Sequence, residues 1–516
     1  MNQLAVKQSH FIYWASGIVS ICGIIFEVLF GALGSYILGD GVKQYTLTIS
    51  LFLTGMGIGA SLSERVMKNL IVTFIYIEFI VALIGGFSSF VMFGITAFSP
   101  PGTDALFLYL ITLTVGALTG VELPVLIRKA NEIGVSLNRS TARVLFSDYA
   151  GGLIGGLLFV FLLRPQFGMV KTAFLVGFIN LLVATIVLWL FRKEIKRFTT
   201  HVIVAVLIGT LLVFGLLFGE EMAFSFEQKL YKDPIIHMEE SKYQKIILTQ
   251  KGEDVRLYLN GGLQLSSFDE YRYHETLVHP AISQANNPTD VLILGGGDGI
   301  AAKEVLKHKD IKSITLVDLD PAVVDLANQN EKLLKLNEYA LQNEKVNVIH
   351  QDAYKFLEGT DRIFDVIIID LPDPNNESLN KLYTREFYAL ARNHMALEGA
   401  MMVQATSPIF ATEVYWTISE TIASNNLETE NFHVDIPSFG NWGFVLASRQ
   451  PIDVKNLEVP IDTRFLTTDI LEGLTVFGKD IDQIITDDNG DIIEVKPNTL
   501  IDPRLIEIYS RSWKYY

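Results

Sequence analysis

The stretch VLILGGGDG, Val291–Gly299, decides the fold of the second half of this chain. Its first four residues, Val291–Leu294, are apolar and predict a buried parallel strand, and the glycines after them predict a turn. A helical pattern resumes at Ala301–Lys307. Strand, glycine turn and helix open a nucleotide-binding βαβ unit, in which bare backbone lets a ligand approach closely.

The glycine turn differs from the dinucleotide-binding fingerprint. GGGDG lacks the spacing of G-x-G-x-x-G, and Asp298 within the turn would repel a pyrophosphate. The turn therefore favours a ligand without phosphates, such as an adenosyl sulfonium, or a ligand that carries positive charge.

Four more apolar runs follow, and helical segments separate them. This alternation predicts a doubly wound, Rossmann-like parallel sheet with helices on both of its faces. Before it, Ile235–Ser267 contains short alternating runs and turn residues, which predict a small antiparallel sheet. The four later strands are expected at 313–320, 346–352, 364–370 and 400–405.

Acidic residues stand at the carboxyl ends of these predicted strands, where such sheets bind their ligands. Asp318 follows the turn by about 20 residues, where an acid can hold ribose hydroxyls. A single Asp at such a place can be a helix N-cap and nothing more. Five around one crevice indicate a site for a polycation or a sulfonium: Asp298, Asp318, Asp352, Asp370 and Asp373.

The two halves of the chain differ in charge. Of 41 Lys and Arg and 57 Asp and Glu in 516 residues, 14 and 9 lie in 1–219, which leaves 27 and 48 in 220–516. The acidic second half is unsuited to binding nucleic acid and suited to attracting cations. The single cysteine, Cys22, excludes an intramolecular disulfide, which fits a soluble half that faces the cytoplasm.

Seven apolar stretches in 1–219 are long enough to span a membrane. They predict a polytopic α-helical membrane domain. The stretches lie near Phe11–Leu38, Tyr45–Leu62, Leu70–Phe98, Ala105–Ile127, Val144–Leu163, Thr172–Leu190 and Val202–Gly219.

Basic residues gather in alternate loops of this half, around Arg65, Arg128 and Arg192. The positive-inside rule places such loops in the cytoplasm, and seven crossings would then leave the second half outside. Either Val202–Gly219 does not cross fully or the rule fails here. We expect a multi-pass protein of the cell membrane with a cytoplasmic second half, because the substrates that a family resemblance of this half implies are made in the cytoplasm.

Four carboxylates fall within or near the apolar stretches. Burying an acid in a membrane is costly, so such residues are candidates for transport. The alternative is a structural role, in which they pair with a nearby Arg, bind backbone or lie at an interface. These residues are Glu27, Glu78, Glu122 and Asp148.

The second half resembles the polyamine aminopropyltransferases, of which spermidine synthase is the familiar member. The resemblance covers about 235–450, while 1–219 looks like the multi-span extension of some bacterial members. The matching stretches are SKYQ (241–244), YLNGGLQLSSFDEYRYHETLVHP (258–280), VLILGGGDG (291–299), TLVDLDPAVVDLA (315–327), QDAYKF (351–356), FDVIIIDLPDP (364–374) and LYTREFY (382–388).

The resemblance implies transfer of an aminopropyl group from decarboxylated S-adenosylmethionine, a co-substrate rather than a cofactor, to a diamine, typically putrescine. The products would be spermidine and 5'-methylthioadenosine. Asp370 would be the general base. An alkyl amine, with a pKa near ~10.4, is mostly protonated at neutral pH and must lose a proton before it attacks.

The resemblance also implies which residues bind each substrate. Those on the donor side would be Gln244, Asp318, Asp352, Ala353, Gly295 and Gly297. Those on the polyamine side would be His274, Asp298, Asp373, Gln264 and Tyr273.

Two departures from the family pattern lie on the acceptor side. Leu371 and Pro372 stand between the paired acids, where the soluble enzymes have two small hydroxyl residues. In IPSFGNWGF (436–444), Phe439 replaces a common tyrosine and Trp442 is added. The resemblance therefore predicts the donor more firmly than the acceptor.

Five regions result: a membrane domain (1–219), a linker (220–234), a small β domain (235–285), the catalytic domain (286–450) and a C-terminal extension (451–516). His274 and His279 are one residue too far apart for the zinc helix H-E-x-x-H, so no metal site is expected. The expected partners are small-molecule substrates and the lipid bilayer, and the soluble relatives commonly form dimers or tetramers.

Two rival functions remain. The first is a methyltransferase that uses intact S-adenosylmethionine on the same scaffold. The second is a membrane polyamine transporter or sensor whose catalytic-like domain only binds.

Overall fold

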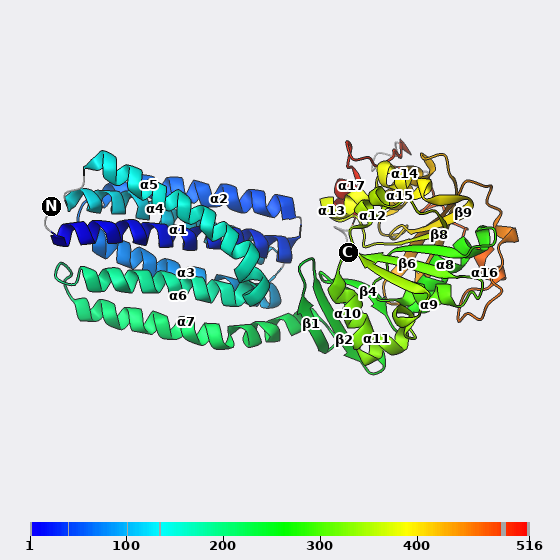
Figure 1. The fold of residues 1–516 in the computed structure, drawn as a ribbon, viewed down its shortest axis with the longest axis horizontal. Coiled ribbons are helices and arrows are strands. Elements are labelled where there is room, and N and C mark those ends of the chain that lie inside the picture. The colour runs from blue at the N-terminus through cyan, green and yellow to red at the C-terminus, as the bar shows by residue number, and fades with distance from the viewer. Residues whose placement is uncertain are drawn as a thin grey trace. The chain divides into compact units, whose positions relative to one another are not determined.

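The structure is a computed structural model that describes residues 3–39, 41–100, 102–133, 136–483, 485–486 and 492–512. The chain divides into two compact units, Met1–Lys232 and Asp233–Tyr516, each drawn in Figure 1. Among the described residues, one hydrophobic cluster lies in the helical unit and three lie in the second unit.

The first unit is a bundle of long apolar helices that run alternately in opposite directions (Figure 1). Six helical stretches within the described ranges are long and apolar enough to cross a membrane. The helices are α1 (Gln3–Leu38), α2 (Gly41–Leu62), α3 (Leu70–Phe98), α4 (Thr103–Glu132), α5 (Leu137–Leu158), α6 (Arg164–Leu190) and α7 (Phe198–Glu227).

The number of stretches is six rather than the predicted seven, because two predicted spans share one continuous stretch, Asn138–Leu190. Within it the π-helical turn Phe159–Leu163 joins α5 to α6. Gly168 then adopts φ 62° and ψ −172°, and Figure 1 shows α5 and α6 running in opposite directions. The chain thus reverses in the short segment 164–171, which lies between the two predicted spans.

The predicted linker 220–234 is largely helical, which corrects the sequence-based boundary. Helix α7 continues to Glu227, and a 3₁₀ turn, Gln228–Leu230, follows it. Glutamates are good helix formers. The polar residues from Glu220 onward therefore mark the end of the apolar stretch and not the end of the helix.

The second unit begins with a four-stranded antiparallel sheet in the order β1-β2-β3-β4, as predicted. Asn260 and Gly261 turn the chain between the last two strands with φ of 49° and 83°, which are the positive values that tight hairpins require. The strands are β1 (Ile235–Glu240), β2 (Lys245–Lys251), β3 (Asp254–Leu259) and β4 (Gly262–Ser266).

The larger sheet has the order β10-β11-β9-β8-β5-β6-β7. Strands β5 to β9 are parallel, and β11 and β10 form an antiparallel hairpin beside β9. The strand order reverses between β5 and β8, and ligands bind beyond the carboxyl ends at such a point. The strands are β5 (Asp290–Gly295), β6 (Ser313–Asp318), β7 (Val346–His350), β8 (Phe364–Asp370), β9 (Met395–Gln404), β10 (Glu428–Ile436) and β11 (Gly440–Ser448).

Helices cover both faces of this sheet. The first face packs against α8 (Glu270–Gln284), whose Leu277 and Val278 share a core with Val291 of β5. Helix α8 thus belongs to the core of the large sheet, although the predicted boundary at 285 assigned it to the small β domain. The other helices are α9 (Ile300–Leu306), α10 (Pro321–Gln329), α11 (Glu331–Leu336), α12 (Ala353–Gly359), α13 (Glu377–Asn380), α14 (Arg385–Asn393) and α15 (Thr412–Ala423).

The C-terminal extension contributes to the cores on both faces. Leu466 and Leu471, before and within α16 (Thr468–Gly473), join the core that contains α8. Leu505 of α17 (Leu505–Ser512) joins the opposite core. A short strand pair, β12 (Ile485–Thr486) and β13 (Ile492–Ile493), lies between these helices in the chain. The extension is therefore an integral part of the second unit.

Candidate active site

The glycine turn follows β5 at the point where the strand order reverses. Gly295 pairs with Asp370 of β8 and has a φ of 86°. A Cβ atom on Gly295 would lie 2.0 Å from the carbonyl oxygen of Asp370. Only glycine fits here, and its absence of a side chain brings the turn and the end of β8 together.

Asp318, the last residue of β6, is bonded to the same turn. Its Oδ2 accepts a hydrogen bond from the backbone N–H of Gly297 at 3.0 Å, and its Oδ1 accepts one from Asp320 at 2.9 Å. Burial raises the pKa of Asp318 to about 6, although these two backbone bonds oppose the rise. The turn and Asp318 thus form one acid-bearing edge.

Asp298 lies two residues before the first residue of α9, the helix that follows the turn. Its Oδ1 accepts a hydrogen bond from the backbone N–H of Ile300 at 2.8 Å, and Asn337 donates to its backbone carbonyl at 2.9 Å. Its negative charge contributes to the raised pKa values of both Asp318 and Asp370. The bond to Ile300 thus holds the carboxylate of Asp298, whose charge acts on Asp318 and Asp370.

Asp370, the last residue of β8, accepts a hydrogen bond from the hydroxyl of Tyr273 at 2.7 Å. Burial raises the pKa of Asp370 to about 6; the positive charge of His274 and the Tyr273 bond oppose this rise, and Asp298 adds to it. Asp370 is therefore ionised at neutral pH and still basic enough to take a proton.

His274 is buried beside Tyr273 on α8. Its Nδ1 lies 3.2 Å from Oε2 of Glu270 and 2.9 Å from the carbonyl oxygen of the same residue. Burial by itself lowers the pKa of His274, but the hydrogen bond and charge of Glu270 outweigh it and raise the pKa to about 9. A cationic imidazole therefore stands next to Asp298 and Asp370.

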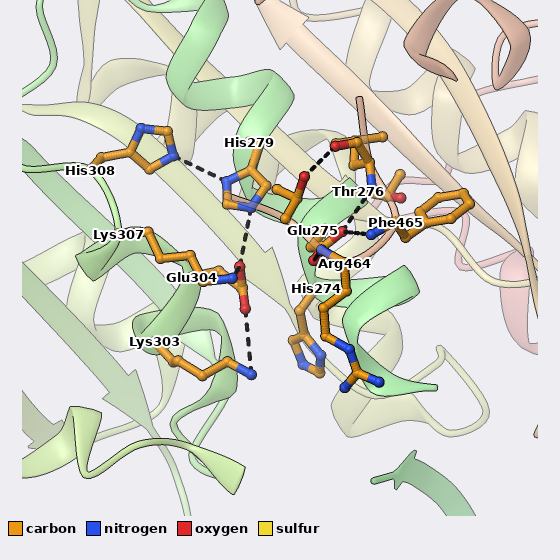
Figure 2. Close-up of polar contacts among 12 residues, drawn as sticks. His274, Glu275, Thr276, His279, Lys303, Glu304, Lys307, His308, Arg464 and Phe465 are labelled. Carbon is orange, nitrogen blue, oxygen red and sulfur yellow. Dashed lines mark hydrogen bonds and ion pairs between the residues drawn. The ribbon is translucent and has the colours of Figure 1, made fainter. Parts of the chain in front are cut away.

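A buried chain of charged groups continues behind His274 (Figure 2). Lys303 bridges Glu270 at 3.0 Å and Glu304 at 3.4 Å, and Glu304 contacts His279 at 3.1 Å. Burial would raise the pKa of Glu304, but His279 and neighbouring lysines lower it to about 2. His279 Nδ1 lies 3.0 Å from Nε2 of His308. The two histidines of His274-Glu275-x-x-x-His279 thus contact different carboxylates: His274 contacts Glu270, and His279 contacts Glu304.

Glu275 anchors the C-terminal extension to α8. Its carboxylate accepts three backbone hydrogen bonds, from Arg464 at 2.7 Å, Phe465 at 2.9 Å and Leu466 at 2.8 Å, and Figure 2 shows the first two of these residues around it. The same helix carries Tyr273, so the extension helps to hold the site.

Asp373 is held by three donors from two segments, the end of β9 and helix α17. Oδ2 accepts hydrogen bonds from the hydroxyl of Thr406 at 2.8 Å and of Tyr509 at 3.0 Å, and Oδ1 accepts one from the amide of Gln404 at 3.2 Å. Burial raises the pKa of Asp373, and these three bonds oppose the rise. Tyr509 comes from α17, so the extension supplies a direct partner of a predicted site residue.

The departures from the family pattern meet beside this acid. Trp442 Nε1 donates to Oε1 of Gln404 at 3.1 Å. The ring of Phe439 packs edge-on against Trp442 at 5.1 Å and lies 6.1 Å from the ring of Tyr273. Leu371, also part of the departures, is buried, and its carbonyl oxygen accepts a bond from Tyr383 at 2.9 Å.

Asp352 and Ala353 begin α12, after β7. Oδ1 of Asp352 caps the helix by accepting from the N–H of Lys355 at 3.1 Å, and Oδ2 pairs with Lys381 at 2.7 Å. Its carboxylate is thus engaged in local structure, while Ala353 is buried.

The two predicted glutamines lie in the small sheet and its turns. Gln244 belongs to a turn whose Ser241 donates to Asp320 at 2.6 Å, which ties that turn to the end of β6. The amide of Gln264 donates to the carbonyl oxygen of Gly262, in its own strand, at 3.2 Å. Gln244 therefore lies near the donor-side acids, whereas Gln264 has no described contact with another predicted site residue.

The structure thus brings most predicted residues to one edge and adds partners that the sequence analysis did not single out. Those that touch predicted site residues directly include Glu270, beside His274, and Tyr509, beside Asp373. The i, i+4 spacing of Glu270 and His274 was a usable signal, but no local pattern relates Tyr509 to Asp373, 136 residues away.

Comparison with known proteins identifies the family of the chain. The spermine/spermidine synthase domain matches residues 270–456. A polyamine aminopropyltransferase of Oceanobacillus iheyensis is 72% identical over all of both chains. Those of Leptospira interrogans (41% identical; 96% of this chain, 97% of the relative) and Streptomyces coelicolor (39%; 96% and 93%) are also similar over nearly their full length.

A crystal structure of spermidine synthase in complex with the transition-state analogue AdoDATO aligns with 47% of this chain and 85% of that chain, at 23% identity and a TM-score of 0.45. The full-length relatives cover the helical unit as well as the second unit. The chain therefore belongs to the polyamine aminopropyltransferases.

Proposed function

We propose that this aminopropyltransferase transfers the aminopropyl group of decarboxylated S-adenosylmethionine to putrescine, giving spermidine and 5'-methylthioadenosine, with Asp370 as the general base. The sulfonium is already an activated leaving group, so the reaction needs neither a metal nor a cofactor. The difficult step is removal of a proton from the attacking amine, which has a pKa near ~10.4 in water.

The observation that carries the proposal is the environment of Asp370. Its carboxylate is half-buried, accepts one hydrogen bond from Tyr273 at 2.7 Å and has a pKa raised to about 6, chiefly by burial. A base with a pKa near the working pH is the effective kind. Asp373, beyond Leu371 and Pro372, supplies a second acid that can hold the far ammonium of the diamine.

The donor side is supported by the acid edge around the glycine turn. Asp318 offers a carboxylate beside the backbone of Gly297, as a ribose would require. Asp298 disfavours the carboxylate tail of intact S-adenosylmethionine, which weighs against the methyltransferase alternative.

The test uses protein purified in detergent. Putrescine, cadaverine or spermidine is incubated with decarboxylated or intact S-adenosylmethionine, and the nucleoside product is identified by mass. Methylthioadenosine with aminopropylated putrescine supports the proposal, and another preferred amine corrects the acceptor. S-adenosylhomocysteine would establish the methyltransferase instead.

Asp370→Asn tests the base. We expect turnover to be lost while binding of the donor, measured by calorimetry, survives, because the variant keeps the shape of the site and loses only the proton acceptor. Asp361→Asn, at an exposed position outside the site, is the matched control. Near-normal turnover of Asp370→Asn would refute the assignment.

We also propose that the helical unit lies in the cell membrane and that the catalytic unit is cytoplasmic, where diamines and the donor are made. The stretch Phe198–Leu230 that contains α7 is as long and apolar as the others, so incomplete crossing does not explain the charge pattern. With seven alternating helices, the basic loops near Arg65, Arg128 and Arg192 lie at the end opposite to the exit of α7. The proposal therefore requires the positive-inside rule to fail here.

A further inference from the structure

The helical unit contains a small cavity that the catalytic reaction does not use. Its volume is about 70 Å³, several times the ~10–15 Å³ that one water needs, and residues of α1, α2, α4 and α5 line it. Its polar lining includes Ser20, Thr119, Glu122 and Asp148.

Three hydroxyl groups lie in this lining, those of Ser16, Ser20 and Thr119, and the last two already donate their hydrogens within the bundle. Ser20 donates to the backbone carbonyl of Asp148 at 2.6 Å. Thr119 donates to the carbonyl oxygens of Val115 and Gly116 at 3.0 and 2.9 Å. The hydroxyls of Ser20 and Thr119 can therefore offer only lone pairs to an occupant, as can an ionised carboxylate.

No side chain with an N–H donor lines the cavity within the described part of the bundle: Lys, Arg, His, Asn, Gln and Trp do not occur in the lining. Ser16 supplies the one hydroxyl whose hydrogen is not already assigned, and the other polar groups offer acceptors, which fits an occupant rich in N–H groups. The other walls are mainly apolar and suit a methylene chain; they include Val19, Ile24, Phe52, Met56, Leu123 and Leu126.

Glu122 is the lining residue that most needs such an occupant. Its side chain is 5% exposed, and its Oε1 has no hydrogen-bond partner. Glu78 of α3, which is 0% exposed, interacts with Glu122, and neither of its oxygens has a donor among the described residues. Two adjacent carboxyl groups in an apolar interior cannot both carry charge without a cation.

We propose that this cavity binds a primary alkylammonium ion, with the carboxylates of Glu122 and Asp148 as charged acceptors and the hydroxyl oxygens of Ser20 and Thr119 as neutral ones. Three N–H donors of the ammonium match this lining, and the alkyl chain lies against the apolar walls. Glu78 holds the one proton that the adjacent pair retains. This site is separate from the acid edge of the catalytic unit and does not depend on its chemistry.

The test measures stoichiometry. Radiolabelled putrescine is equilibrated by dialysis with the full-length protein in detergent, without donor. We expect the wild type to bind one putrescine more per chain than Glu122→Gln and Asp148→Asn do, whatever the catalytic unit binds. Glu221→Gln, an exposed acid on α7, is the matched control and should bind as many as the wild type. Equal stoichiometry in the wild type and both cavity variants would overturn the proposal.

A competition experiment on the wild type needs no variant to fold. We expect n-butylammonium to displace half of the bound putrescine. At the same concentration, tetramethylammonium, which has the same charge and no N–H, should displace at least tenfold less putrescine. Equal displacement by the two ions would show that charge alone is recognised and would refute the proposed hydrogen bonding to the ammonium. Catalysis of aminopropyl transfer is assayed separately, so failure of the cavity site and failure of the proposed reaction remain distinguishable.

Discussion

Substitution of Tyr273 by phenylalanine isolates one hydrogen bond of the proposed base. The bond from Tyr273 to Asp370 is 2.7 Å long and favours the ionised form of that carboxyl. A hydrogen bond to a charged group contributes about 1.5–3 kcal/mol, which corresponds to roughly 1–2 pKa units at 1.36 kcal/mol each. Its loss should raise the pKa of Asp370 from about 6 to roughly 7–8.

The direction of the pH effect follows from the role of the base. Asp370 must be ionised to accept a proton, so activity is present above its pKa and is lost as the pH falls through it. In Tyr273→Phe the acidic limb should therefore move upward. At pH 6 kcat/KM should fall roughly 5- to 50-fold below the wild type, since ~1–10% of the carboxyl is ionised instead of ~50%. At pH 9 the two proteins should differ much less.

The assay is release of methylthioadenosine across pH 5 to 9, at saturating donor and varied putrescine. Tyr388→Phe is the matched control, because Tyr388 is also buried and its hydroxyl has no hydrogen-bond partner within the described residues. Its profile should match the wild type. An acidic limb that stays in place in Tyr273→Phe, whatever the change in KM, would refute the reasoning.

Three further outcomes are expected. Tyr509→Phe removes one hydrogen-bond donor from Asp373. It should raise KM for the amine about fivefold, for a bond of about 1 kcal/mol, and leave KM for decarboxylated S-adenosylmethionine unchanged. Equal changes in both KM values would contradict an acceptor-side role. Glu275→Gln leaves one carbonyl oxygen where a carboxylate accepted three backbone bonds, and should lower the free energy of unfolding in urea by roughly 3 kcal/mol; an unchanged midpoint would contradict the anchoring. In a cysteine-free background, an impermeant maleimide should label Lys193→Cys in intact cells and spare Lys309→Cys, and the reverse pattern would place the catalytic unit outside.

The sequence analysis predicted the large sheet because each parallel strand is a short apolar run that ends in an acid. Asp318 and Asp370 could be placed at one edge without coordinates, since the carboxyl ends of parallel strands meet there. The four-stranded antiparallel sheet was equally readable, because Asn260 and Gly261 are typical of a tight hairpin. The hydrophobic pattern of a strand and the residue types of a tight turn are local features of the sequence, and the strands of both sheets depend on little else.

The features that were not predicted depend on contacts between distant residues. Tyr509 reaches Asp373 through the packing of α17, and Glu275 meets the backbone of Arg464 across 189 residues. Neither pair leaves a periodic signal. The true end of α7 was missed for another reason: polarity reports where an apolar surface stops, whereas a glutamate-rich segment continues as helix.

The acid edge around the glycine turn also affects how the proposed reaction ends. Decarboxylated S-adenosylmethionine carries a sulfonium and an ammonium, and both are gone from methylthioadenosine. The attraction that Asp298, Asp318 and Asp370 exert on the nucleoside therefore disappears when the aminopropyl group is transferred, while the lengthened polyamine keeps its charges. Release of the nucleoside is favoured by the chemistry itself, and product inhibition by it should be weak. Added salt should then weaken binding of the donor and leave the affinity for methylthioadenosine nearly unchanged.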